Sequence, residues 1–202
     1  MSPRALTEQE KEFQKKKILT KARELVLIYG VKHVSIDEII NAAGVGKATF
    51  YGYFSSKEEL MIQLVWGIYQ EILVQAEIVI KSSSRDKLPQ TIGEFLKSLI
   101  QEKDKVFFFS NHQDLEQLIS NMQPLEIQDF NQMEYYAFER LITLAGLDVR
   151  RVKPDVVHNY IHAMYFSISD SCMMQEHMEE TITVMTTGLL NYLFGEVQYG
   201  GE

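Results

Sequence analysis

Apolar residues recur at helical spacing along almost the whole chain, and no stretch alternates between apolar and polar positions as a strand would. Gly30 stands where a left-handed residue commonly ends a helix. We therefore predict a first helix that begins near Thr7 and ends at this glycine in a left-handed conformation. Its buried face is expected to consist of Ile18, Ala22, Leu25, Val26 and Tyr29.

Two short helices are predicted next. Ser35-Ile-Asp-Glu38 is a capping box, in which the serine hydroxyl accepts from a backbone amide and the glutamate reaches back. Gly44 is expected to end that helix, and a second one is expected over Lys47–Phe54. Two short helices joined by a glycine-containing turn are the helix-turn-helix plan of DNA-binding proteins.

The rest of the chain is also predicted to be helical. A capping box at Ser56–Glu59 opens a long helix that reaches about Lys81, followed by a polar break over 82–86. Further helices are expected near 88–103, 106–121, 125–146, 154–174 and 178–195. The predicted fold is therefore all-α, with a three-helix helix-turn-helix domain over 1–56 and a helical domain over 57–202. The long helix is expected to contribute to both domains.

The net charge of −8 is unevenly distributed. Residues 1–57 contain 10 Lys and Arg against 6 Asp and Glu, whereas residues 58–202 contain 10 against 22. This asymmetry indicates a small basic module carried by a larger acidic one. Phosphate binding depends on local cations, so the acidic remainder does not argue against DNA as a partner.

Composition favours a cytoplasmic protein. No apolar run approaches the roughly 18 residues that a membrane helix needs, and the N-terminus does not resemble a signal peptide. The single cysteine, Cys172, excludes an internal disulfide framework. We therefore expect no membrane partner.

Residues 35–60, SIDEIINAAGVGKATFYGYFSSKEEL, resemble the DNA-binding signature of the TetR (tetracycline repressor) family. The resemblance implies a homodimer that binds double-stranded operator DNA. It also implies that the C-terminal domain mediates dimerisation and binds a small-molecule effector, which loosens the grip on DNA. The signature covers about the first quarter of the chain when the preceding helix is included.

The resemblance also implies roles for single residues. Those at the exposed start of the recognition helix would read bases, the two tyrosines would contact phosphates and flanking bases, and the serine and the last lysine would contact the DNA backbone. The implied DNA-binding set is Ser35, Lys47, Ala48, Thr49, Tyr51, Tyr53 and Lys57. The chain departs from the family pattern at Gly46, where a Ser or Thr cap is common, and at Gly52, where a longer residue is usual. A glycine inside a helix costs roughly 1 kcal/mol relative to alanine.

The C-terminal domain is rich in aromatic residues, and polar side chains among them are the better candidates for a ligand pocket. Few cations accompany them, which favours a neutral, aromatic or cationic effector over a multiply anionic one. The candidate pocket residues are Trp66, Tyr69, Phe108, Asn111, His112, Gln132, Tyr135, Tyr136, His162 and Phe166.

The last two predicted helices have a wider apolar surface than one small domain needs. Pairing with the same helices of a second chain would bury that surface in a four-helix bundle. The candidate dimer-interface residues are Val157, Ile161, Met164, Ile168, Met185, Leu189, Tyr192 and Leu193.

Other chemistries are not supported. A phosphate loop over Asn41–Thr49 would need glycine and Ser or Thr where Asn41 and Ala48 stand. His158 and His162 have the spacing of a metal pair, but no third ligand lies near them in sequence, so packing is the better interpretation. Cys172 is not ordered with other residues as a catalytic unit. We therefore expect no enzyme, no cofactor and no metal.

The leading hypothesis is a ligand-responsive dimeric repressor with an apolar or aromatic effector. A second is a DNA-binding activator or organiser of the same fold without a small ligand, which a filled core would favour. A third, from another class, is a helical enzyme or ligand carrier that does not bind DNA. The complete set of predicted DNA-binding residues from Lys47 to Lys57 argues against this third hypothesis.

Overall fold

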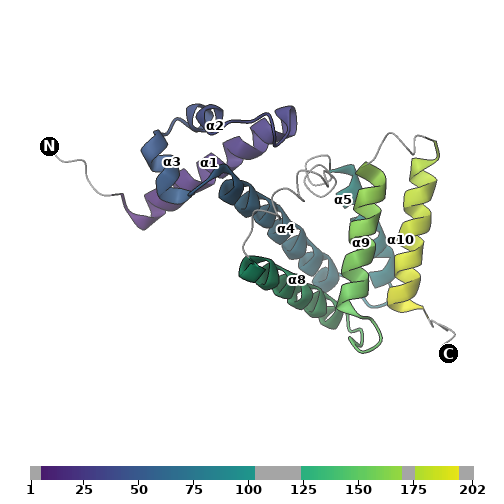
Figure 1. Cartoon of the computed structure of the whole chain (residues 1–202). Coiled ribbons are helices and arrows are strands. Elements are labelled where there is room, and N and C mark those ends of the chain that lie inside the picture. Colours follow the sequence, from purple (N-terminus) through teal and green to yellow (C-terminus); the bar gives the residue numbers. More distant parts are fainter. Residues whose placement is uncertain (1–5, 103–123, 170–175, 196–202) are drawn as a thin grey trace. The chain divides into compact units, whose positions relative to one another are not determined.

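A computed structural model of the chain describes residues 6–102, 124–169 and 176–195, with only the backbone described for residues 124–130, 166, 168 and 169. The described residues form helices and no strand, which confirms the predicted all-α fold (Figure 1). The helix predicted over 106–121 lies outside the described residues. Contacts divide the chain into two compact units, Met1–Gly67 and Ile68–Glu202.

The division between the units falls inside one helix, α4 (Lys57–Ser82). Leu60, Met61 and Leu64 in its first two turns are buried and belong to the N-terminal unit, whereas its residues from Ile68 onward belong to the C-terminal unit. The predicted boundary at residue 56 therefore lies just before α4, and the contact boundary lies within it.

The N-terminal unit contains α1 (Glu8–Tyr29), α2 (Ile36–Ala43), α3 (Lys47–Tyr53) and the start of α4. α2 packs against both α1 and α3. Tyr29, the last residue of α1, is 56% exposed, so the buried face of this helix ends one turn earlier than predicted. The core of the unit includes Ile18, Ala22, Val26, Val34, Ile39, Ala43, Phe50 and Phe54.

Glycines end the first two helices in different conformations. Gly44 has φ 63° and ψ 40°, which is the predicted left-handed cap of α2. Gly30 has φ 82° but ψ 158°, so the left-handed cap predicted for α1 is wrong. That conformation is still accessible almost only to glycine, because a Cβ would clash with the backbone there.

Capping side chains fix where α2 and α4 begin. The predicted box at Ser35 and Glu38 is present, with the amide of Glu38 donating to Ser35 Oγ at 3.2 Å and the amide of Ser35 donating to Glu38 Oε2 at 2.7 Å. At α4 the prediction is half right. The amide of Glu59 donates to Ser56 Oγ at 3.1 Å, but the Glu59 carboxylate accepts from the amide of Ser55 at 2.7 Å.

The C-terminal unit contains the rest of α4, α5 (Leu88–Gln101), α8 (Pro124–Leu144), α9 (Pro154–Ser169) and α10 (Met178–Phe194). α9 packs against α8 and α10, and α10 also packs against α5 (Figure 1). A Cβ at Gly93 would lie 3.0 Å from Leu190 Cδ1, so the glycine permits the close approach of α5 and α10. Arg151 donates hydrogen bonds to the carbonyls of Tyr192 and Gly195, and thus supplies partners for carbonyl groups at the C-terminal end of α10.

Candidate DNA interface and effector cavity

α3 turns one face toward the core of the N-terminal unit and the other toward solvent. Phe50 is fully buried, and Phe54, directly after the helix, is 1% exposed. Lys47, Ala48 and Tyr51 are exposed. The two buried rings hold the helix in place, so its N-terminal side chains are accessible, as those of a recognition helix must be.

The two unusual glycines leave this helix short of side-chain contacts. Gly46 is the N-cap residue and makes no side-chain cap hydrogen bond, in contrast to Ser35 at the start of α2. Gly52 is exposed, with nothing within 4 Å of the place where a Cβ would stand. α3 is therefore held by its buried phenylalanines more than by caps, and position 52 has no side chain for reading bases.

Lys47 at the start of α3 already has a partner on α2. Its Nζ lies 3.3 Å from Asp37 Oδ1, and the two side chains are 60% and 68% exposed. Ion pairs this exposed contribute at most about 1 kcal/mol. Lys47 can therefore exchange this carboxylate for a DNA group at little cost.

The two tyrosines of α3 differ in their surroundings. Tyr51 is 48% exposed, and its ring meets that of Phe50 edge to face at 5.4 Å. Tyr53 is half-buried, and its hydroxyl donates to Gln14 Oε1 on α1 at 3.0 Å. Tyr53 thus connects two helices of the unit, while Tyr51 is the tyrosine with the more accessible ring.

Ser35 and Lys57 come from different helices and both act on Glu38. Hydrogen bonds from the Ser35 amide and hydroxyl lower the pKa of Glu38, and the nearby charge of Lys57 lowers it further. Ser35 is exposed and Lys57 is half-buried at the first position of α4. Together with the start of α3, these residues put the predicted DNA-binding set in the N-terminal unit.

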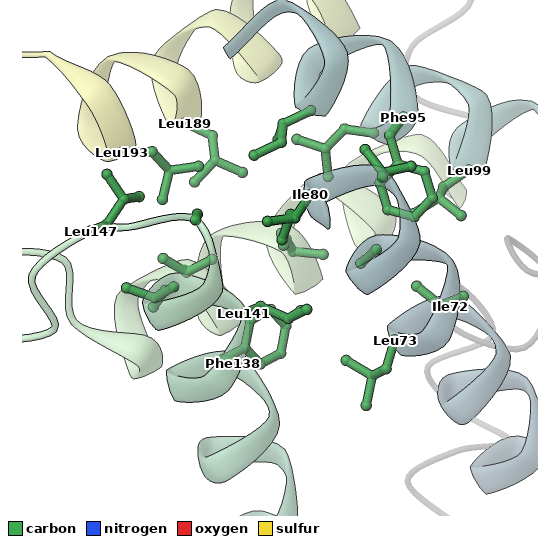
Figure 2. Close-up of a pocket in the computed structure, with 18 of the residues that line it drawn as sticks. Ile72, Leu73, Ile80, Phe95, Leu99, Phe138, Leu141, Leu147, Leu189 and Leu193 are labelled. Atoms are coloured by element: carbon green, nitrogen blue, oxygen red, sulfur yellow. The ribbon is translucent and has the colours of Figure 1, made fainter. Parts of the chain in front are cut away.

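The C-terminal unit contains an apolar cavity of about 120 Å³. Figure 2 shows aliphatic and aromatic side chains of α4, α5, α8 and α10 directed into this space. The labelled lining residues are Ile72, Leu73 and Ile80 of α4, Phe95 and Leu99 of α5, Phe138 and Leu141 of α8, Leu147, and Leu189 and Leu193 of α10. α9 adds Val157, Ile161, His162 and Tyr165.

The polar groups of the cavity lining are two tyrosines and one histidine. Burial raises the pKa of Tyr69, and the neighbouring charge of Glu134 raises it further. Burial also raises the pKa of Tyr165. Both hydroxyls are therefore neutral at physiological pH. These two residues and His162 contribute to a lining whose surface toward the cavity is apolar.

Only part of the predicted pocket set lines this cavity. Tyr69 and His162 do, whereas Trp66 belongs to the N-terminal unit. Three predicted residues, Gln132, Tyr135 and Tyr136, are exposed on α8 and do not line this cavity. The predicted residues Phe108, Asn111, His112 and the side chain of Phe166 lie outside the described part of the chain.

The aliphatic lining was missed because the prediction favoured polar residues among aromatic ones. The lining residues of α4, such as Ile72, Leu73 and Ala76, have the helical spacing that also marks an ordinary core. Sequence spacing cannot separate a filled core from a cavity, because both are built from the same apolar faces.

The predicted dimer interface needs correction. Val157, Met164, Leu189 and Leu193 are buried within the chain itself, so they form intrachain core and not a free surface. Of the other predicted residues, Ile161 lines the cavity, and the side chain of Ile168 is not described. The carbonyl of Met185 accepts a hydrogen bond from Tyr160 Oη. Tyr192 Oη accepts a hydrogen bond from the Lys153 amide. The helices were predicted correctly, but most of these residues lie on their inward faces.

Comparisons with known proteins agree with the interpretation of the N-terminal unit as a DNA-binding unit. A family profile described as "Bacterial regulatory proteins, tetR family" matches residues 18–64. An uncharacterized HTH-type transcriptional regulator encoded in the lacX 3′ region of Lactococcus lactis subsp. lactis is 28% identical over 171 residues, which cover 79% of this chain and 82% of the relative.

Solved structures resemble the whole described architecture. A TetR-family regulator from Pectobacterium atrosepticum has a TM-score of 0.66 at 15% identity and covers 94% of this chain and 96% of its own. A putative TetR-family regulator from Syntrophomonas wolfei has a TM-score of 0.67 at 17% identity, with 93% and 98% covered. The fatty acid degradation regulator FadR from Bacillus halodurans has a TM-score of 0.63 at 16% identity, with 92% and 96% covered. At these identities the likeness concerns the fold.

The fold and the exposed α3 define a helix-turn-helix DNA-binding protein. Residues 18–64 match the tetR family of bacterial regulatory proteins, and solved TetR-family regulators share the fold of the chain. Within the described residues, no helix combines the length and the apolar character that a membrane crossing requires.

Proposed function

We propose that this chain is a homodimeric repressor that occupies operator DNA in the bacterial cytoplasm and leaves it when a small, largely apolar molecule binds. The observation that carries the proposal is the apolar cavity in the unit that follows the DNA-binding unit. A cavity lowers the stability of a fold, so a protein that only binds DNA would gain nothing from one.

On DNA, the exposed start of α3 would enter the major groove. Lys47, Ala48 and Thr49 would face base edges, and Tyr51 would reach a phosphate or a flanking base. Lys57 and Ser35 would contact the phosphate backbone. Tyr53 would chiefly hold α3 against α1, because its hydroxyl is already bound to Gln14.

The cavity favours a compact, uncharged effector or a short apolar part of a larger one. An engineered apolar cavity of about 150 Å³ binds benzene, so a cavity of about 120 Å³ suits a group of similar or smaller size. Among the described residues that line it there is no Lys or Arg to balance an anion.

Coupling between cavity and DNA would pass through α4. This one helix supplies Tyr69, Ile72 and Ala76 to the lining and begins in the N-terminal unit at Lys57. A ligand that displaces α4 would favour a state in which two recognition helices no longer match successive major grooves. Such coupling typically changes affinity five- to 150-fold, or about 1–3 kcal/mol.

The test uses the full chain and an operator selected from random double-stranded DNA. Benzene is the probe, and we expect it to weaken operator binding in fluorescence anisotropy. Ala76→Met fills the cavity from α4 and should abolish the effect of benzene. Val74→Met on the exposed side of the same helix is the matched control and should respond like the native chain.

An operator affinity that no ligand changes would support the rival hypothesis of a DNA-binding organiser without a small ligand. If neither benzene nor a library of neutral compounds changes operator affinity or the melting temperature of the chain, the proposed response is wrong. Absence of operator selection from random DNA would instead favour a helical ligand carrier.

A further inference from the structure

Three potential metal ligands meet in the C-terminal unit. Glu134 comes from α8, and His158 and His162 lie one turn apart on α9, which places both imidazoles on the same face of that helix. One ligand atom from each residue lies within 4.8 Å of the other two. The sequence showed the histidine pair but not the third ligand, because Glu134 belongs to another helix.

Glu134 occupies a position where a carboxylate needs a cation. It is 5% exposed, and a buried carboxylate without a compensating charge is costly. The carboxylate therefore draws positive charge to this place, and that charge can be a proton or a metal ion.

The contact between Glu134 and His158 is not a good hydrogen bond. Glu134 Oε2 lies 3.0 Å from His158 Nε2, yet this nitrogen is buried and has no hydrogen-bond partner of acceptable geometry. The carboxylate is thus close to the ring nitrogen without lying along an N–H direction. Two ligands bound to one ion have this relation, because both direct lone pairs at a point between them.

The distances suit a small ion. Zn²⁺ binds imidazole nitrogen and carboxylate oxygen at about 2.0–2.2 Å, so two such ligands at a tetrahedral angle lie about 3.4 Å apart. The His158–Glu134 separation of 3.0 Å is near this value, and the two histidine rings lie with centroids 4.2 Å apart at an interplanar angle of 45°.

We propose that Glu134, His158 and His162 bind one first-row divalent transition-metal ion of the Zn²⁺ class. Two imidazoles with one carboxylate suit Zn²⁺, Ni²⁺, Co²⁺ or Fe²⁺, whereas Mg²⁺ and Ca²⁺ prefer sites made only of oxygen ligands. A water molecule would supply the fourth ligand to the ion, as in Zn²⁺ sites with three protein ligands. The site does not depend on the proposed response to an apolar ligand.

The test titrates the untagged full chain with Co²⁺ and follows its visible absorption, which intensifies when the ion leaves octahedral water for a low-coordinate protein site. Competition with a chromophoric chelator then gives the Zn²⁺ affinity. We expect one ion per chain. Glu134→Gln and His162→Gln should each weaken binding at least 100-fold, more than the about 10–100-fold typical of a lost outer-shell contact.

His177→Gln is the matched control, because this histidine is highly exposed and outside the cluster. It should bind like the native chain. Circular dichroism of the metal-free variants establishes that each is folded, and Zn²⁺ should raise the melting temperature of the native chain and of His177→Gln only. The proposal is overturned if the native chain does not bind Co²⁺ or if Glu134→Gln and His162→Gln retain native affinity.

Discussion

Side chains at the DNA-facing surface are already engaged inside the protein. Lys47 pairs with Asp37, and Ser35 both donates to and accepts from Glu38. These partners orient the side chains, but they also compete with DNA for them. The carboxylate of Asp37 in addition repels phosphate, so the residues beside the predicted contacts are expected to tune affinity as much as the contacts do.

We predict that Asp37→Asn and Lys57→Ala change DNA binding in opposite directions. Asp37→Asn frees Lys47 and removes a negative charge, so affinity should rise for all sequences. Lys57→Ala should weaken binding to operator and scrambled DNA alike and reduce the salt slope by roughly one. Anisotropy titrations at two salt concentrations measure both effects.

Lys81→Ala is the control for this pair. Lys81 is an exposed cation at the end of α4 that pairs with Glu77 at 2.9 Å, and it belongs to the C-terminal unit. The Lys81→Ala variant should leave the affinity for DNA and the salt slope of that affinity unchanged. Equal losses from Lys57→Ala and Lys81→Ala would mean that net charge, and not a contact at Lys57, governs binding.

At the scale of elements, the short helices of the N-terminal unit depend on their ends. α2 has eight residues and α3 has seven, too few to be stable alone in water. α2 has a complete capping box and a glycine C-cap, whereas α3 has no side-chain cap. α2 can thus act as the fixed support against which α3 packs.

We predict a pH signature for the α2 cap. Because hydrogen bonds from Ser35 lower the pKa of Glu38, its stabilising effect is fully present above the ordinary glutamate pKa of about 4.3 and is lost as pH falls through the lowered folded-state value. The melting temperature of Glu38→Gln should therefore lie below that of the native chain at neutral pH and converge with it in acid.

Ser35→Ala is the companion variant. It removes the hydroxyl that accepts from the Glu38 amide, and loss of such an N-cap typically costs about 1 kcal/mol. Thermal unfolding followed by circular dichroism measures both variants. A constant gap between Glu38→Gln and the native chain across the whole pH range would show that the charge of the carboxylate contributes nothing.

At the scale of the molecule, we propose the outer face of α9 and α10 as the surface that pairs with a second chain. Val184, Thr187, Gly188 and Asn191 are exposed and follow one another at helical spacing on α10. Val156 and Ala163 are exposed on α9. This exposed face would pair with the same face of a second chain in a four-helix bundle, which replaces the buried set expected from sequence.

We predict that Val184→Asp dissociates the dimer. Val184 is 66% exposed in the single chain, so the aspartate should not disturb the fold, but it would be buried without a partner in the dimer. Analytical ultracentrifugation should show monomers, and operator affinity should fall with loss of the second recognition helix. Val74→Asp, at a valine that is 56% exposed on α4, is the matched control. Intact dimers of Val184→Asp would exclude this face.

Features encoded by neighbouring residues could be predicted from the sequence. The start and end of α2 follow from Ser35, Glu38 and Gly44, which act over three or four positions. The DNA-binding signature is likewise contiguous, so its residues could be assigned to one small unit. Local hydrogen bonding and steric limits determine such features, and distant parts of the chain change them little.

Features that combine distant segments were decided by the tertiary structure. Helical spacing marked the apolar faces of α9 and α10, but only packing against α5 and α8 determined that Leu189 and Val157 face inward. The cavity lining and the approach of Glu134 to the histidine pair arose in the same way. The physical reason is that spacing determines which side chains share a helix face, whereas the packing of other helices determines what that face meets.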